Sequence, residues 1–108
     1  MSRIKSICDE KDFSKLYKQG KRWYCEGINV IFLEANELKM SVIASKKVGR
    51  AVDRNRAKRL MREAFFKVEN LITRGYYVLI AKNDILDLDF CQLEKNLKWG
   101  LRRLKCLA

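Results

Sequence analysis

Hydrophobic residues recur at helical spacing near the start, past the middle and at the end of this chain. Between residues 10 and 18, Phe13, Leu16 and Tyr17 fall at positions i, i+3 and i+4, on one face of a short helix. Asp9 precedes this segment and is suited to cap its first turn. The same spacing recurs between residues 53 and 70 and between residues 89 and 105, which predicts two longer helices.

Strands are expected in four segments that lie between these helices. They are short, rich in β-branched and aromatic residues, and bounded by Gly, Asn and Asp; they comprise residues 22–25, 29–34, 38–44 and 76–81. The predicted order is therefore α-β-β-β-α-β-α. In a chain of 108 residues, this order predicts a single domain (residues 1–108) of the α+β class, a two-layer sandwich with helices packed on one sheet.

The charge of the chain is strongly unbalanced. It has 24 Lys and Arg against 13 Asp and Glu, a formal net charge of +11. Polyanions are the natural partners of so basic a small protein, with nucleic acid as the first candidate and an anionic membrane surface as the second. A basic protein without such a partner is the third possibility.

The sequence also bears on location. No window approaches the roughly 18 consecutive apolar residues of a membrane span. The first twelve residues are charged and lack the apolar core of a signal peptide, so a cytoplasmic protein with no membrane partner is expected.

The helix expected at residues 53–70 has two distinct faces. At 100° per residue, one stripe is apolar and is expected to pack on the sheet: Ala57, Leu60, Met61, Ala64, Phe65 and Val68. A separate face is cationic and nearly continuous: Arg54, Asn55, Lys58, Arg59 and Arg62, with Arg56 and Lys67 at its far edge.

This cationic face is unfavourable for the helix itself. Lys58 forms like-charge pairs at i,i+4 with both Arg54 and Arg62, and each pair costs about 0.2–0.5 kcal/mol. The first turn also carries Arg54 and Arg56, where the helix dipole favours anions. Bound phosphates would account for this arrangement, because arginine forks match phosphate oxygens. The alternative is a solvated basic face.

Two acidic residues accompany these cations. Asp53 is expected to be the N-cap of the helix, and Glu63 is the only acid that offsets the cationic face. Lys46 and Lys47 extend the basic patch ahead of the helix, which favours nucleic-acid binding over simple solvation.

Cysteine and histidine usage limits the chemistry. The chain has no histidine, and its four cysteines are widely spaced: Cys8, Cys25, Cys91 and Cys106. This argues against a zinc site, whose ligands usually come in close pairs, and against Ser–His or Cys–His catalysis. In a reducing cytosol the thiols are interpreted as small apolar residues and not as a disulfide framework.

Residues 45–65 read S-K-K-x-G-x-A-V-x-R-N-R-x-K-R-x-x-R-E-x-F. This long and specific pattern resembles the signature of the bacterial ribonuclease P protein family. The resemblance covers most of the chain: an early helix carries F-x-x-x-Y followed by K-x-G-K, here Phe13, Tyr17, Lys18, Gly20 and Lys21. Outside the signature it rests mainly on the order of elements.

The resemblance implies a function and one feature of the fold. In this family the protein joins a large catalytic RNA, which holds the catalytic Mg²⁺ ions and hydrolyses one phosphodiester of precursor tRNA to remove the 5′ leader. The protein supplies no catalytic side chain and binds no cofactor or metal of its own. The family also implies a left-handed βαβ crossover, against the general right-handed rule.

The resemblance implies two binding surfaces. The basic stretch would contact the catalytic RNA through Lys46, Lys47, Arg50, Arg54, Asn55, Arg56, Lys58, Arg59 and Arg62. A cleft between the sheet and the first helix would take the single-stranded leader on Phe13, Tyr17 and Phe32, since aromatic rings stack on unpaired bases. Ordinary core packing is the alternative for Phe13.

Three further aromatic residues have two possible roles each. Phe66 falls on the cationic face, where it either stacks on RNA or, as we favour, packs beneath the 70–75 loop. Trp23 and Trp99 are expected to be packing or interface residues in preference to RNA stackers.

The sequence is also compatible with two other functions. Another small basic RNA-binding protein, such as a ribosomal protein, shares the charge pattern but does not need the 45–65 signature. A stand-alone nuclease would cleave RNA with the protein's own groups, and the absence of histidine disfavours it.

Overall fold

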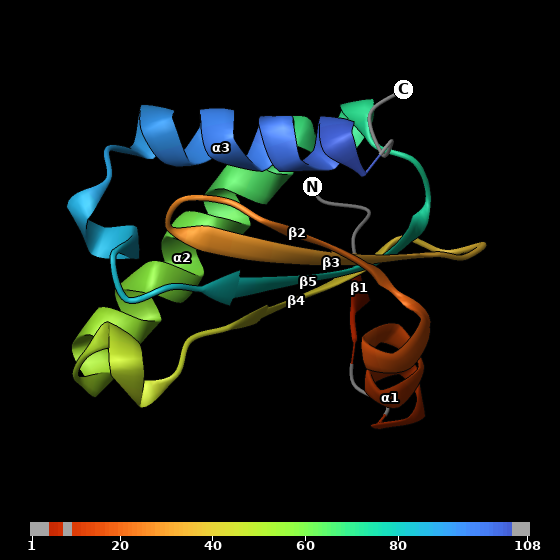
Figure 1. Ribbon diagram of the computed structural model, residues 1–108, viewed down its shortest axis with the longest axis horizontal. Coiled ribbons are helices and arrows are strands. Elements are labelled where there is room, and N and C mark those ends of the chain that lie inside the picture. The colour runs from red at the N-terminus through yellow and green to blue at the C-terminus, as the bar shows by residue number, and fades with distance from the viewer. Residues whose placement is uncertain (1–4, 8–9, 105–108) are drawn as a thin grey trace.

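The computed structural model describes residues 5–7 and 10–104. Figure 1 shows one twisted sheet with α1 on one side and α2 and α3 on the other. The strands are β1 (Lys5–Ser6), β2 (Lys21–Tyr24), β3 (Ile28–Glu34), β4 (Lys39–Ile43) and β5 (Gly75–Ala81). The helices are α1 (Glu10–Gln19), α2 (Ala51–Val68) and α3 (Phe90–Arg103), with short 3₁₀ turns at Lys46–Val48, Glu69–Leu71 and Ile85–Asp87.

The sheet is mixed, with the strand order β1-β4-β5-β3-β2. The neighbours β4 and β5 are parallel, whereas β3 pairs antiparallel with both β5 and β2. Because β4 and β5 run in the same direction, the chain has to return along the sheet between them, and α2 makes this crossover. The hand of the crossover stays a prediction from the family resemblance.

Strand register divides the apolar residues between two cores. The larger core lies under α2 and α3 and includes Val30, Tyr77 and Leu79, all fully buried. The smaller core lies under α1, where Leu16 packs with Ile31 and Val78. The predicted α+β class is confirmed: α2 and α3 form the second layer of the sandwich, and α1 adds partial cover on the other face.

The apolar stripe predicted for the long helix is confirmed. Ala57, Met61, Ala64, Phe65 and Val68 are buried against the sheet, and Leu60 is half-buried. The ring of Phe65 meets that of Tyr77 edge-on, with centroids 5.2 Å apart. This burial fixes which side of α2 faces the sheet, and therefore which side faces solvent.

The structure differs from the sequence-based expectation in one missed strand and in several element boundaries, of which the start of the long helix matters most for the site. β1 precedes α1 and was missed because its two residues, Lys5 and Ser6, are polar and carry no alternation; only pairing with Lys39 and Met40 of β4 defines it. The long helix begins at Ala51 and not at Asp53. The expected cap Asp9 and helix end Lys105 lie outside the described residues.

Among the helices that the structure describes, none is both long enough and apolar enough to cross a membrane.

Candidate nucleic-acid interface

A short, internally bonded loop leads into α2. The Oγ of Ser45 accepts a hydrogen bond from the Lys47 N–H (3.3 Å), and the Gly49 N–H donates to the Lys46 carbonyl (3.1 Å). These bonds close one 3₁₀ turn and leave the Lys46, Lys47 and Arg50 residues exposed. The loop therefore presents three cations just ahead of the helix.

The first turn of α2 is stabilised by Asp53, but not in the way the sequence suggested. Arg50 occupies the N-cap position with an extended backbone (φ −70°, ψ 170°), and its N–H donates to Oδ2 of Asp53 at 3.1 Å. Asp53 is therefore the third helical residue, and the prediction that it is the N-cap is wrong. Its carboxylate also lies in the anion-favouring first turn. Nη1 of Arg54 donates to the Gly49 carbonyl at 3.1 Å, which ties the helix to the loop.

Among the described residues, no acidic side chain forms an ion pair with the cations on the outward face of α2. Asn55, Arg56, Arg59, Arg62 and Lys67 are exposed, and Arg54 and Lys58 are half-buried. The ion pairs formed among residues 5–7 and 10–104 lie elsewhere: Lys5–Glu37, Lys39–Asp12, Lys39–Glu37 and Lys98–Glu94. The positive charge of this face is thus available to an external anion.

Part of this face surrounds one open depression of about 510 Å³, which we call the α2 groove. It is lined by Asn55, Lys58, Arg59, Arg62, Glu63 and Phe66. Arg56 is exposed but does not line the groove, because it lies at the far edge of the helix face. Phe66 is 42% exposed, so the favoured expectation that it packs under the following loop is wrong.

Lys47 lines a second depression with residues that the sequence analysis missed. Its lining residues are Asn29, Ser45, Lys47, Ile80, Ala81, Lys82 and Asn83. The Oδ1 atom of Asn29 is buried and, among the described residues, has no hydrogen-bond partner. An asparagine within the apolar run of β3 was the signal that could have identified this place, because a half-buried amide usually has a partner.

The aromatic residues expected in a cleft beside α1 separate onto two faces of the sheet. Phe13 and Tyr17 lie on α1 with stacked rings 6.4 Å apart; Phe13 is half-buried against the smaller core, and Tyr17 is 38% exposed. Phe32 is buried in the larger core against Tyr77, with ring centroids 4.9 Å apart. Its placement in that cleft is therefore wrong, because its neighbours Ile31 and Leu33 point to the α1 side.

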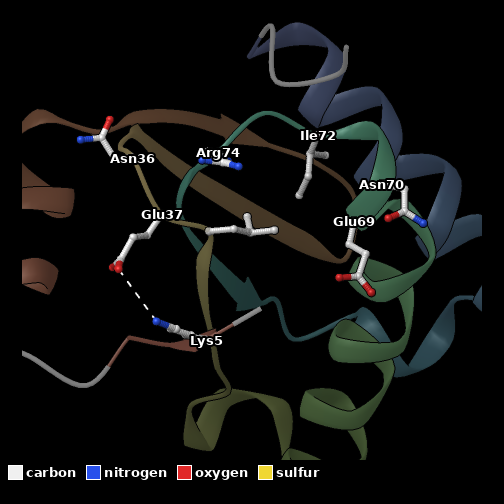
Figure 2. Close-up of a pocket in the computed structure, with 8 residues that line it drawn as sticks. Lys5, Asn36, Glu37, Glu69, Asn70, Ile72 and Arg74 are labelled. Atoms are coloured by element: carbon white, nitrogen blue, oxygen red, sulfur yellow. Dashed lines mark ion pairs between the residues drawn. The ribbon is translucent and has the colours of Figure 1, made fainter. Parts of the chain in front are cut away.

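A third depression has mixed charge and does not suit a polyanion. Figure 2 shows it between the β3–β4 turn, β1 and the segment that follows α2. Lys5 and Arg74 line it together with Glu37 and Glu69, and Lys5 is ion-paired with Glu37 at 3.9 Å. The two carboxylates offset the cations, unlike the situation in the α2 groove.

Within residues 5–7 and 10–104, no group of three or more His, Cys, Asp or Glu side chains is placed to hold a metal ion.

The fold and site together define a class of protein: a small α+β domain whose crossover helix carries a cationic face, free of ion pairs with the other described residues, after a basic loop. The family model described as Ribonuclease P matches residues 1–105. The chain belongs to the ribonuclease P protein family, as the signature at residues 45–65 predicted.

Named relatives and solved structures agree with this membership. The chain is 30% identical to the ribonuclease P protein component of Nitratiruptor sp. (97% of this chain, 96% of that one) and 34% identical to that of Clostridioides difficile (94% and 93%). The RNase P protein of Staphylococcus aureus superposes with a TM-score of 0.83 at 26% identity (95% and 97% covered). That of Thermotoga maritima superposes with a TM-score of 0.79 at 25% identity (92% and 96% covered).

Proposed function

We propose that this chain is the protein subunit of ribonuclease P, which binds the catalytic RNA and the 5′ leader of precursor tRNA and so assists removal of the leader. The observation that carries the proposal is the unpaired cationic face of α2, which stands within the family signature. It is rich in arginine, which pairs bidentately with phosphate oxygens.

The α2 groove is the proposed contact with the catalytic RNA. Arg59 and Arg62 line it with Lys58, and Asn55 adds an amide that can donate to a sugar, base or phosphate. The loop cations Lys46 and Arg50, and Arg54 and Arg56 at the helix start, extend the contact. In this proposal hydrolysis is carried out by the RNA with its own Mg²⁺, and the protein contributes binding only.

The leader is proposed to lie along the α1 side of the sheet. Tyr17 offers an exposed ring at one end, and the Lys47 depression lies at the other. Ile80 connects them, because it packs against the core under α1 and also lines that depression. The unpartnered Oδ1 of Asn29 can accept a hydrogen bond from a nucleobase there. We further propose that the protein works in the cytoplasm, where precursor tRNA is processed.

Reconstitution tests this proposal. The purified chain, added to a bacterial ribonuclease P RNA, is expected to stimulate cleavage of precursor tRNA at low Mg²⁺, where the RNA alone is slow. The protein alone is expected to leave the substrate intact. Lack of stimulation would contradict the subunit assignment, and cleavage by the protein alone would support a stand-alone nuclease.

A second measurement tests the leader surface. Tyr17→Ala is expected to weaken binding of the reconstituted enzyme to precursor tRNA, by about 1–3 kcal/mol if one base stacks on the ring. Affinity for mature tRNA, which lacks the leader, should stay the same. An equal loss for both ligands would contradict a leader contact at Tyr17.

A further inference from the structure

The C-terminal half of α3 presents an exposed tryptophan beside the edge strand β2. Trp99 is 46% exposed, and its ring meets that of Trp23 edge-on with centroids 5.2 Å apart. Trp23 lies close over Gly100, where an added Cβ would be 3.2 Å from Cδ1 of the indole. The ring of Trp23 therefore packs against α3 at Gly100, while much of Trp99 is exposed to solvent.

The surroundings of Trp99 are cationic. The guanidinium carbon of Arg103 lies 5.2 Å from the centroid of Trp99 and 5.8 Å from that of Trp23. The positions three and four residues away on the helix surface are Lys95, Asn96, Arg102 and Arg103, so three of these four neighbours are basic and none is acidic.

Helix stability explains only part of this arrangement. Arg102 and Arg103 lie in the last turn of α3, where cations interact favourably with the helix dipole. The dipole does not account for Lys95 near the middle of the helix, nor for an indole left in solvent, because large aromatic side chains gain most when they are buried. An external ligand would account for both.

We propose that Trp99, Trp23 and Arg103 form a platform on which an unpaired RNA base stacks, with Lys95 and Arg102 beside it to pair with phosphates. Exposed aromatic rings within a basic surface suit single-stranded nucleic acid, since bases stack on the rings while cations bind the backbone. Tryptophan and arginine are also enriched at protein interfaces, so a second copy of the chain is the competing occupant, and the test includes self-association. This inference rests on the proposed function, because it presumes an RNA-binding protein, but it uses a different element from the α2 groove.

Tryptophan fluorescence gives a direct test. Both tryptophans of the chain belong to the platform, so tryptophan emission, excited selectively over that of the four tyrosines, reports on this place alone. Titration of the full-length protein with a single-stranded oligoadenylate is expected to quench the emission. An RNA duplex of equal length should quench little, because its bases are paired and enclosed within the helix and cannot be splayed onto the rings.

Variants of the platform sharpen the test. Trp99→Leu keeps Trp23 as a reporter and is expected to lose most of the quenching and to bind the oligoadenylate about tenfold more weakly. Trp99→Phe retains an aromatic ring and should keep most of the affinity. Arg103→Gln is expected to weaken binding less than Trp99→Leu does, and circular dichroism checks that each variant is folded.

The experiments distinguish the platform hypothesis from the proposal that the chain is a ribonuclease P subunit. Arg59→Glu, in the α2 groove, is expected to leave the full quenching amplitude at saturation. Stimulated precursor cleavage without quenching would overturn the platform alone, whereas quenching without stimulation would overturn the subunit assignment alone. Equal quenching by single strand and duplex, or unchanged quenching in Trp99→Leu, would also overturn the platform. Self-association of the protein in the absence of RNA, if Trp99→Leu abolishes it, would also overturn the platform, because a second copy of the chain would then occupy this surface.

Discussion

The thiols of Cys25 and Cys91 lie in opposite environments. Cys25 is buried between β2 and α3, where its Sγ donates to the Asn96 carbonyl at 3.3 Å, whereas Cys91 is exposed. The interpretation of the cysteines as small apolar residues therefore holds for Cys25 and is wrong for Cys91; Cys8 and Cys106 lie outside the described residues. Burial raises the pKa of the Cys25 thiol to about 11, and the nearby Lys82 ammonium opposes this rise only in part.

Alkylation should separate the two thiols. At pH 8, Cys25 is expected to react with iodoacetamide at least about 100-fold more slowly than Cys91, because a raised pKa leaves little thiolate and burial limits access. Peptide mass spectrometry over time measures both rates. In urea the two rates should become similar, and comparable rates in the native protein would contradict the buried environment.

The same pKa shift has a consequence for stability. The neutral thiol is favoured in the folded protein, so its contribution to folding stability is fully present below the ordinary thiol pKa, near 9, and is lost as the pH rises through about 11. The wild type is therefore expected to lose stability between pH 9 and 11 relative to Cys25→Ala. Urea unfolding of both proteins across this range measures the difference, and parallel pH profiles would contradict it.

Gly49 is required by the geometry of the loop before α2. Its φ of +141° lies in a region that other residues rarely adopt, and an added Cβ would come within 2.5 Å of Oδ2 of Asp53. Gly49→Ala is expected to destabilise the protein by about 1–3 kcal/mol, measured by urea unfolding. Asp53→Asn keeps an acceptor oxygen and should cost less; equal stability of Gly49→Ala and the wild type would contradict the constraint.

At the scale of the element, α2 combines a stabilising face and a destabilising one. Its buried stripe packs on the sheet, while Lys58 stands one turn from both Arg54 and Arg62, which repel it. A helix selected for stability alone would mix charges on this face. The unfavourable charges therefore support the proposal that the face binds a polyanion.

Because the cationic face destabilises α2 but is proposed to bind RNA, Lys58→Glu is expected to have opposite effects on folding stability and on RNA binding. Lys58→Glu replaces two like-charge pairs with two opposite-charge pairs and should stabilise the fold by about 0.8–2 kcal/mol. The same variant should bind ribonuclease P RNA more weakly. Arg74→Glu, on the mixed-charge depression, is the matched control for one charge reversal and should affect RNA binding less. Urea unfolding and filter binding measure the two effects, and unchanged RNA affinity of Lys58→Glu would favour a merely solvated face.

At the scale of the whole molecule, the net charge of +11 is unevenly distributed. Three ion pairs use Asp12 or Glu37, near α1 and the β3–β4 turn, and a fourth joins Lys98 and Glu94 on α3, while the outward side of α2 keeps its charge. The positive field of the molecule is therefore directed and not uniform, which favours steering of an RNA toward the crossover helix.

Salt dependence tests this distribution. RNA affinity is expected to fall steeply with salt, with a slope of log K against log salt of about −0.7 to −0.9 for each phosphate neutralised. Arg59→Glu should make the slope shallower by the contribution of about one phosphate contact or more, while Arg74→Glu should leave the slope nearly unchanged. A flat affinity between low and moderate salt would contradict phosphate contacts.

The sequence by itself determined the two faces of α2 and the identity of its family. Helical periodicity is local: residues three and four apart share a face whatever the rest of the chain does, so the stripe from Ala57 to Val68 and the cations opposite it follow from spacing alone. The signature from Ser45 to Phe65 is likewise contiguous, and needs no tertiary contact to be recognised.

Only the tertiary structure decided what depends on pairing between distant segments. Phe32 faces the larger core because β3 pairs with β5 in one register, and a shift by one residue would turn it to the α1 side. β1 is a strand only because β4 lies beside it. Trp23 and Trp99 are 76 positions apart in the chain, and no local pattern brings them together; β2 and α3 meet because each buries apolar side chains in the same core.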